Sequence, residues 1–161
     1  MQQFHGHSTS ESLCRVLMPD ISTVITSAHD NTVRVWDVNS GTCRHVLDGH
    51  ASPVLALAAD ENLLFSGERD GIVTIWDLTT GQCLHTLECA PSSVYKFHFN
   101  EDKTLLAGAC SKGDIKIWRV REWYGPSTML SGKSACLADM VKLTNRDLQR
   151  THYGRHAALK P

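Results

Sequence analysis

Residues 30–37 read DNTVRVWD, and residues 70–77 read DGIVTIWD, so the two segments are nearly the same sequence. A third version, KGDIKIWR, occupies residues 112–119. Tryptophan therefore returns at positions 36, 76 and 118, at steps of 40 and 42 residues. A period of about 40 residues is typical of a chain that uses one small structural unit several times, each unit burying the apolar face of its neighbour.

The residues around each tryptophan predict β-strands joined by tight turns. Val33 and Val35 stand three and one positions before Trp36, and the other two copies have valine or isoleucine at the equivalent places. Each of these β-branched runs follows a pair such as Asp30-Asn31, and Asn and Gly tolerate the positive φ that two-residue hairpin turns require. The same spacing of runs and turns along the rest of each unit predicts four antiparallel strands per unit.

A Gly-His pair precedes the first two copies, as Gly6-His7 and Gly49-His50, whereas Cys89-Ala90 stands at the third place. On these residues the chain resembles the WD-repeat family over roughly residues 1–132. The resemblance implies that one His, one Ser or Thr, one Asp and one Trp form a buried hydrogen-bonded tetrad in each unit. The tetrad positions are His7, Thr26, Asp30 and Trp36 in the first unit, His50, Ser66, Asp70 and Trp76 in the second, and Trp118 alone in the third.

We expect these tetrads to be structural and not catalytic, because residues fixed by the geometry of a unit recur with the unit and an active site rarely does. An indole fills the space between adjacent sheets, and its N–H needs an acceptor that a Ser or Thr hydroxyl supplies. We expect the His50 set to be complete. The His7 set should be looser, because His7 lies near a terminus.

The fold expected from the repeats and the resemblance is all-β: an incomplete β-propeller of about three four-stranded antiparallel WD-repeat blades with an irregular C-terminal tail. The units lie near residues 7–47, 50–87 and 91–131, and the closing strand of the last unit is expected at 128–133. In the non-repeat tail, 133–161, we expect a short helix near 134–143 and no regular structure beyond about residue 146. Closed propellers need about four to eight blades. The leading interpretation is therefore a piece or truncated isoform of a longer propeller; the alternative is closure through another chain or self-association.

Charge and cysteine content narrow the function classes. Residues 129–161 hold six Lys and Arg against two Asp and Glu, but without the dense basic run or interleaved aromatics that nucleic-acid binding favours, so we do not expect such binding. The six cysteines include no C-x-x-C pair, which argues against a metal site, and we expect reduced thiols in a cytoplasmic or nuclear protein. No run reaches the ~18 apolar residues of a membrane span.

The resemblance implies a non-catalytic protein–protein interaction scaffold or adaptor subunit of a multiprotein complex. The sequence has no P-loop, nucleophile elbow or H-E-x-x-H motif, so we expect no catalytic residues and no cofactor. The alternative is a substrate-recognition subunit of a ubiquitin ligase, and an enzyme or RNA-binding protein is less favoured. Loops on a rigid scaffold are where binding sites concentrate, and the candidate partner-binding rim consists of His29, Arg69, Ser111, Ser52 and Ser92.

Overall fold

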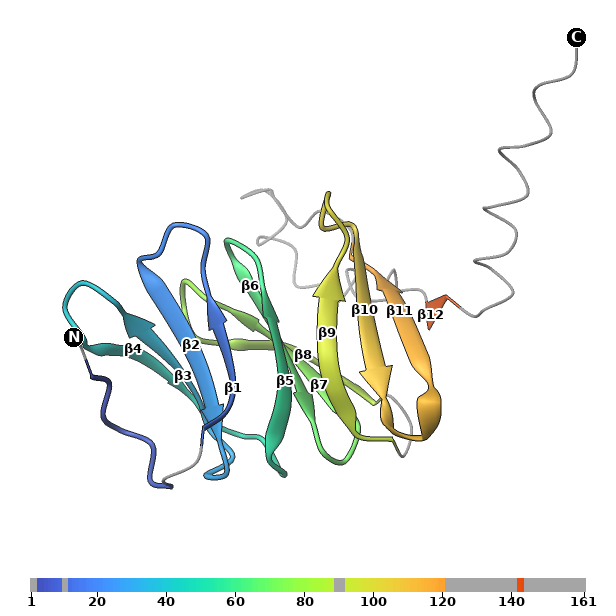
Figure 1. Cartoon of the computed structure of the whole chain (residues 1–161), viewed down its shortest axis with the longest axis horizontal. Helices are drawn as coiled ribbons and strands as arrows, with labels where there is room; N and C mark the ends of the chain where they lie inside the picture. The colour runs from blue at the N-terminus through green and yellow to red at the C-terminus, as the bar shows by residue number, and fades with distance from the viewer. Residues whose placement is uncertain (1–2, 10–11, 89–91, 121–141, 144–161) are drawn as a thin grey trace, which may run out of the picture. The chain divides into compact units, whose positions relative to one another are not determined.

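The computed structural model describes residues 3–9, 12–88, 92–120 and 142–143 of the 161-residue chain. The described chain is all-β, with three four-stranded antiparallel sheets and one short 3-10 helix (Figure 1). This architecture confirms the expected fold of about three β-propeller blades. We call the three sheets blade 1, blade 2 and blade 3.

The strands follow chain order within each blade, from one edge of the sheet to the other. Blade 1 consists of β1 (Ser12–Leu17), β2 (Thr23–Ala28), β3 (Val33–Asp37) and β4 (Cys43–Leu47). Blade 2 consists of β5 (Val54–Ala59), β6 (Leu63–Glu68), β7 (Ile72–Asp77) and β8 (Cys83–Glu88). Blade 3 consists of β9 (Val94–Phe99), β10 (Leu105–Cys110), β11 (Ile115–Arg119) and β12 (Lys142–Leu143), with the 3-10 helix η1 (Ser111–Gly113) between β10 and β11.

The three repeated tryptophans confirm the alignment of the units. Trp36, Trp76 and Trp118 lie in β3, β7 and β11, the third strand of each blade, and all three are buried. Because the side chains of a strand alternate between its two faces, equal positions in the three strands place the indoles on equivalent faces of the blades.

The Asp that follows Trp in the first two repeats holds the next turn. Asp37 Oδ1 accepts hydrogen bonds from the backbone N–H groups of Asn39 and Ser40, both at 2.9 Å. The turn ends at Gly41, whose φ of 73° is a conformation that glycine adopts without strain. The same pattern recurs after β7 around Asp77. The repeated Trp-Asp pair thus combines a core residue with a turn-capping residue.

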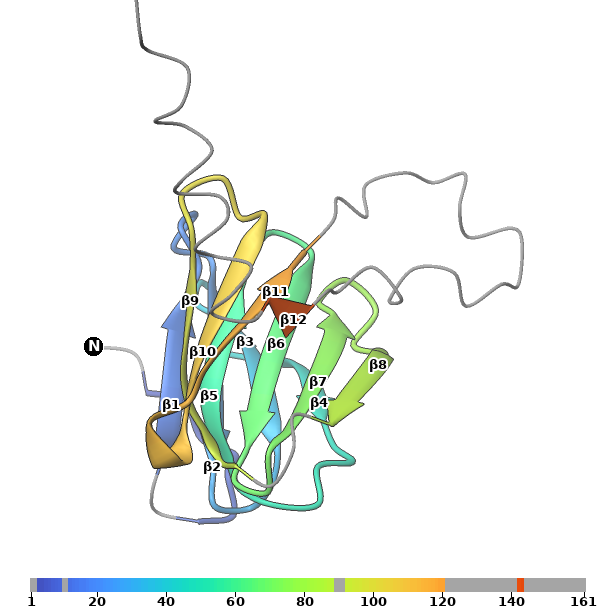
Figure 2. The same ribbon diagram turned by 90° about the vertical axis from the view of Figure 1, so that its right-hand side faces the viewer.

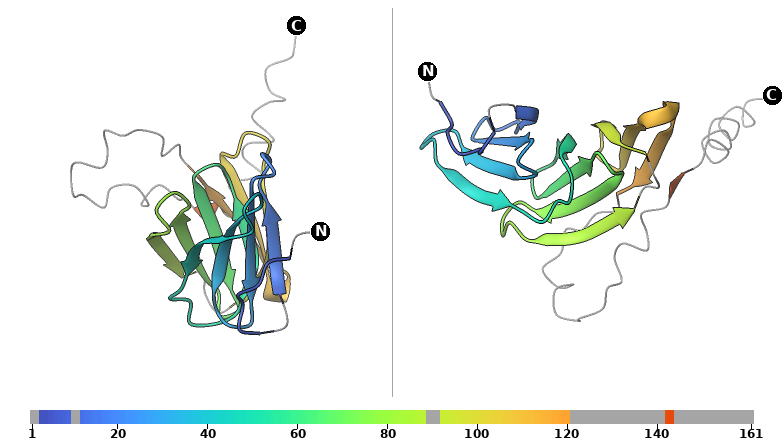
Figure 3. Two further views of the ribbon diagram at one scale, coloured as in Figure 1. Left: turned by 90° about the vertical axis from the view of Figure 1, so that its left-hand side faces the viewer. Right: turned by 90° about the horizontal axis from the view of Figure 1, so that it is seen from below.

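The main apolar core lies between blade 1 and blade 2, which stack face to face (Figure 3). Its buried members are Met18, Ile25, Val33, Val35 and Leu47 from the blade 1 segment and Val54, Leu57, Leu64 and Trp76 from blade 2. A buried hydrogen bond of 2.9 Å from Ser27 Oγ to the Val54 carbonyl also joins the two sheets. Blade 2 therefore presents its tryptophan face to blade 1.

The chain divides into two compact units, residues 1–98 with 108–114 and residues 99–107 with 115–161. In the first unit, β6 packs closely on the start of β9 at Gly67. A Cβ atom placed there would lie 2.9 Å from Val94 and from the Phe97 ring, closer than side chains pack. Only glycine fits at this contact.

In the second unit, β11 pairs with β12, so that Ile117 lies opposite Leu143 and Trp118 opposite Lys142 (Figure 2). Residues 142–143 were expected at the end of a helix, and at these two residues that expectation is wrong. Pairing with β12 satisfies the edge of β11, which otherwise exposes its backbone N–H and C=O groups. The expected closing strand at 128–133, the rest of the expected helix and the chain beyond residue 143 lie outside the described residues.

Candidate functional site

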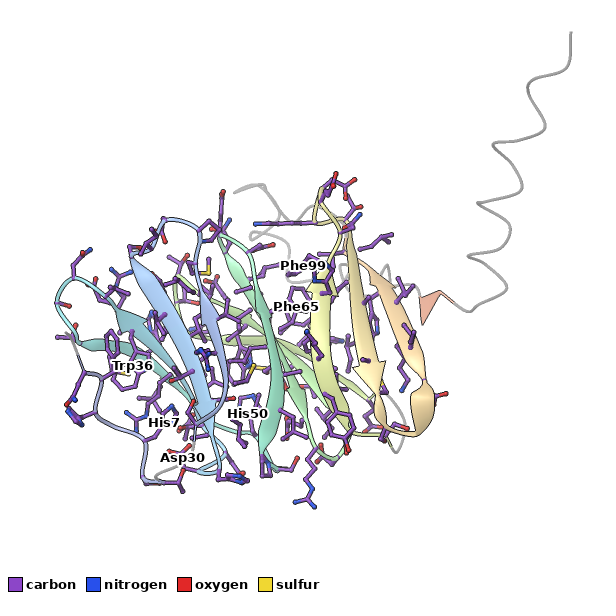
Figure 4. All side chains as sticks on the ribbon, in the orientation of Figure 1. His7, Asp30, Trp36, His50, Phe65 and Phe99 are labelled. Carbon is purple, nitrogen blue, oxygen red and sulfur yellow. The ribbon has the colours of Figure 1, made fainter. Side chains whose placement is uncertain are left out.

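Blade 1 contains a closed chain of hydrogen bonds from its tryptophan to its aspartate. Trp36 Nε1 donates to Thr26 Oγ1 at 2.8 Å, and His7 Nε2 lies 2.8 Å from the same hydroxyl oxygen. The other ring nitrogen, His7 Nδ1, lies 3.0 Å from Asp30 Oδ2. Figure 4 shows the His7 ring between Trp36 and Asp30.

The Asp30 carboxylate also holds the surrounding backbone. It accepts the N–H of Ser8 at 2.9 Å, the N–H of Thr32 at 3.1 Å and the Thr32 hydroxyl at 2.8 Å. Burial raises the pKa of this carboxyl, but the hydrogen bonds from Ser8, Thr32 and His7 outweigh burial and hold its pKa well below the ordinary value. Asp30 is therefore an ionised acceptor that fastens the N-terminal segment to the β2–β3 turn.

Blade 2 begins with the same arrangement. Trp76 Nε1 donates to Ser66 Oγ at 2.9 Å, and His50 Nε2 lies 3.0 Å from this oxygen. Ser66 also donates its hydroxyl proton to the Thr74 carbonyl at 3.2 Å. Since that proton is used, His50 Nε2 must carry the proton shared with Ser66.

The chain of hydrogen bonds in blade 2 stops at His50. The Nδ1 atom of His50 is buried and has no hydrogen-bond partner among the described residues. Asp70, at the tetrad position, is exposed. Among the described residues, its carboxylate accepts one hydrogen bond, from the backbone N–H of Ile72 at 3.3 Å. The two histidines thus have opposite proton positions: Nδ1–H in His7, which faces a carboxylate, and Nε2–H in His50.

Glu68 does in blade 2 what Asp30 does in blade 1. Its side chain is buried, and Oε2 accepts the backbone N–H groups of Ala51 and Ser52, both at 3.1 Å. Burial raises the pKa of Glu68, and these hydrogen bonds oppose that rise. The loop after Gly-His is therefore held by a carboxylate in both blades, but by a different residue.

The burial of His50 sets its charge. Burial lowers its pKa from 6.5 to about 4, although the Asn31 backbone and the carboxylates of Asp48 and Asp70 favour the protonated ring. His50 is therefore neutral at pH 7. A neutral imidazole is less costly to bury than a charged ring.

The expected order of the two networks is wrong: the His7 set is closed and the His50 set is interrupted. The reason lies at the position two residues before the tetrad Asp, where blade 1 has Ala28 and blade 2 has Glu68. Glu68 accepts the N–H groups of the loop that the aspartate binds in blade 1, and Asp70 is exposed instead. A sequence signal was present, because a charged residue at the end of an otherwise apolar strand must find donors when it is buried.

The candidate rim residues differ in how open they are. His29 and Arg69 are exposed, whereas Ser52 and Ser111 are half-buried. Ser92 is only 7% exposed, so its side chain is not open on the rim as expected. The sequence also missed Asp70 as a rim residue, because the tetrad assignment placed its carboxylate inside the blade.

Hydrogen bonds connect one rim loop to the next. The Arg69 N–H donates to the Pro53 carbonyl at 3.0 Å, and the Ser93 hydroxyl donates to the Arg69 carbonyl. The Ser111 N–H then donates to the Ser93 carbonyl at 2.8 Å. This ladder joins the loops at the start of β5, β7, β9 and η1 into one rigid edge.

In the part of the chain that the structure describes, no group of three or more His, Cys, Asp or Glu side chains is placed to hold a metal ion. No helix there has the length and apolarity needed to cross a membrane.

Comparison with known proteins identifies the family. The model of the family "WD domain, G-beta repeat" matches residues 1–37, 41–77 and 81–119. The chain therefore belongs to the WD-repeat family, as its resemblance indicated. Repeats of this family generally mediate binding to other proteins and are generally not enzymes.

The curated relatives match over short stretches. Mitochondrial division protein 1 of Sclerotinia sclerotiorum is 44% identical over 45 residues, which cover 28% of this chain and 7% of that protein. Mitochondrial division protein 1 of Emericella nidulans is 36% identical over 64 residues, covering 40% of this chain and 10% of that protein. The matched stretch spans a tenth or less of the length of these relatives.

Two solved structures of designed proteins share the fold. The computationally designed Ika4 protein superposes with a TM-score of 0.65 at 30% identity, covering 73% of this chain and 71% of that chain. The computationally designed Ika8 protein superposes with a TM-score of 0.64 at 31% identity, covering 73% of this chain and 35% of that chain.

Proposed function

We propose that this chain is a non-catalytic scaffold or adaptor subunit of a multiprotein complex, and that its rim loops grip a protein partner. The observation that carries the proposal is the hydrogen-bond ladder from Pro53 through Arg69 and Ser93 to Ser111. Loops fixed in this way lose little conformational entropy when a partner binds, so their side chains form a preorganised surface.

The chemistry of the rim supports a polar partner surface. Arg69 and Asp70 are exposed next to each other in the β6–β7 turn, and His29 is exposed in the equivalent turn of blade 1. Arg is enriched in protein interfaces, where its guanidinium forms paired hydrogen bonds with carboxylates. The rim therefore suits a partner with acidic and hydrogen-bonding side chains.

The cysteines support a reducing compartment for this work, the cytoplasm or the nucleus. Cys43 and Cys83 occupy equivalent ends of β4 and β8 as free thiols, as the repeat alone explains. Structural thiols of this kind persist where disulfides are kept reduced.

Site-specific photo-crosslinking tests the rim. A photoreactive amino acid replaces Arg69 in one variant and Glu61 in a matched control, because Glu61 lies in the β5–β6 turn at the opposite end of the same blade. In cells that express the chain, we expect position 69 to form adducts with a small set of proteins and position 61 to form none of these. Identical adducts from both positions, or none from position 69, would contradict the proposal.

The identity of the crosslinked proteins sharpens the function. Subunits of a ubiquitin ligase would narrow the adaptor to a substrate-recognition role. Turnover of a small molecule by the purified chain would overturn the non-catalytic assignment.

A further inference from the structure

Asp30 and Asp70 occupy equivalent positions in blades 1 and 2 but differ in how many donors they bind. Asp30 accepts hydrogen bonds from both the N–H and the hydroxyl of Thr32, and it also contacts the His7 ring. Asp70 is exposed, and among the described residues its carboxylate accepts one hydrogen bond, from the Ile72 N–H at 3.3 Å. A carboxylate that binds so little of its own blade is available to a group outside it.

Two differences between the repeats explain why Asp70 is not held inside. Glu68 stands in place of Ala28 and accepts the N–H groups of the loop after Gly-His. Ile72 stands in place of Thr32 and has no hydroxyl to donate. In blade 2 the structural task of the tetrad aspartate is therefore carried by another residue, and the carboxylate at position 70 is left on the rim.

The exposure of Asp70 and of the preceding Arg69 does not come from the lack of a neighbouring blade. Blade 2 shares an apolar core with blade 1 on one face. On its other face, Gly67 of β6 lies against Val94 and Phe97 of β9. Asp70 and Arg69 are exposed because they lie in the turn beyond the end of β6, at the rim.

The backbone of this turn is already bonded within the protein. The Arg69 N–H donates to the Pro53 carbonyl at 3.0 Å, and the Arg69 carbonyl accepts the Ser93 hydroxyl. The Asp70 N–H donates to Ser52 Oγ at 3.3 Å. The side chains of Arg69 and Asp70 are thus the groups left for a partner. Because they start from a fixed backbone, ordering them on binding costs less conformational entropy.

The charges of the turn are not neutralised within the described part of the chain. Neither Arg69 nor Asp70 forms an ion pair with another described residue. Burial raises the pKa of the nearby Glu68, and the charge of Asp70 raises it further. A cation bound at Asp70 would relieve this repulsion between carboxylates, while the planar guanidinium of Arg69 suits a carboxylate.

We propose that Arg69 and Asp70 together bind a protein segment in which a carboxylate and a Lys or Arg side chain lie next to each other. This inference rests on the proposed function of the rim and names the charge pair that its partner carries. Asp70 pairs with the cation, and Arg69 pairs with the carboxylate through two hydrogen bonds. A segment with charges of one sign would bring a like charge against one of the two residues, which disfavours binding.

A random peptide library displayed on phage tests this charge pair, with the full chain as the target. We expect the selected peptides to carry adjacent acidic and basic residues. For a selected peptide, Asp70→Asn should weaken binding about fivefold, the upper range for a solvent-accessible ion pair. Replacing the basic residue of the peptide by Gln should cost the same on the wild-type chain and almost nothing on Asp70→Asn. Arg69→Gln should show the same coupling to the acidic residue of the peptide.

Control variants keep the test decisive. Asp70→Asn retains an oxygen that can accept the Ile72 N–H, so its urea midpoint should match that of the wild type. Glu61→Gln removes the same charge at the opposite end of blade 2 and should leave peptide binding unchanged. Selected peptides with charges of one sign, affinities that Asp70→Asn does not change, or a library that yields no binder would overturn the inference. Adducts from position 69 in the crosslinking experiment would still support the rim function in each of these cases, so the two failures are distinguishable.

Discussion

Blade 1 and blade 2 hold the same loop with different carboxylates, and the difference shows what a repeat fixes and what it leaves free. Both blades place a hydroxyl beneath the indole N–H and a histidine beside that hydroxyl, at 2.8–3.0 Å. They differ at the next step. In blade 1 the histidine binds Asp30, which also binds the loop. In blade 2 Glu68 binds the loop, and the hydrogen-bond network stops at the histidine.

Neighbouring carboxylates compete for the same backbone donors. The loop after Gly-His presents one or two backbone N–H groups that need an acceptor, and any carboxylate within reach can supply it. Glu68 extends from the end of β6 and leaves Asp70 exposed. Whether a blade forms a closed tetrad therefore depends on every carboxylate near the loop, and not only on the residue at the aspartate position.

The largest expected effect that separates the blades is a pH dependence from His50. Its pKa falls from 6.5 when unfolded to about 4 when folded, so the unfolded chain binds the extra proton between these values. The stabilisation that comes from the neutral His50 ring is complete above about pH 6.5 and is lost as the pH falls toward 4. We expect a loss of about 3 kcal/mol in the free energy of unfolding, measured by urea denaturation.

The control for this pH dependence is His50→Gln, whose amide cannot titrate. The difference in unfolding free energy between wild type and this variant should shrink steadily as the pH falls from 7 to 4. Other titrating groups, Glu68 among them, are present in both proteins and cancel. A constant difference over this range would mean that His50 is not buried as a neutral ring.

The next effect is the loss of Asp30. In Asp30→Ala, the backbone N–H groups of Ser8 and Thr32 and the ring N–H of His7 lose their acceptor together. We expect a destabilisation of about 2 kcal/mol at pH 7, because several donors, most of them partly buried, lose a charged acceptor at once. Chemical denaturation measures this destabilisation. A loss no larger than that of Glu68→Ala would remove the distinction between the blades.

A smaller effect is expected at Glu68. Replacing it in Glu68→Ala leaves the Ala51 and Ser52 N–H groups without their acceptor, which is fewer donors than lose theirs in Asp30→Ala. We expect a destabilisation of about 1 kcal/mol, with faster hydrogen exchange at these two amides. Glu68→Gln retains an acceptor oxygen and should recover most of the loss. Unchanged exchange at both amides would show that Glu68 does not hold the loop.

The smallest effect is expected at Asp70, although it stands where Asp30 stands in the repeat. Asp70→Ala removes an exposed carboxylate with one long hydrogen bond. We expect a change within about 0.5 kcal/mol, the range of an ordinary surface substitution. A cost as large as that of Asp30→Ala would place Asp70 inside a closed tetrad.

The sequence was sufficient for the parts of the fold that depend on periodicity. The Trp36, Trp76 and Trp118 positions predicted the third strand of each blade, because turn residues and β-branched runs keep one phase through the repeats. It was insufficient where two side chains compete for one partner, as Glu68 and Asp70 do. It also missed β12, because a two-residue strand has too short a pattern to distinguish from a helix end.

The row that Arg15 and Arg34 form on one face of blade 1 was visible only after the strand register was known. Arg15 and Arg34 are 19 positions apart, and no local pattern joins them. The strands bring them into one row, with Thr26 between them. Long-range placement of this kind follows from topology and not from composition.

The proton positions on the two histidine rings test the difference between the blades most directly. At pH 7, two-bond ¹⁵N–¹H NMR spectra of the imidazoles report which ring nitrogen carries hydrogen. The hydrogen bonds described here predict a proton on Nδ1 of His7, shared with Asp30, and a neutral His50 with its proton on Nε2, shared with Ser66. A proton on Nδ1 of His50 at pH 7 would contradict the account, because it would mean that blade 2 closes the same network as blade 1.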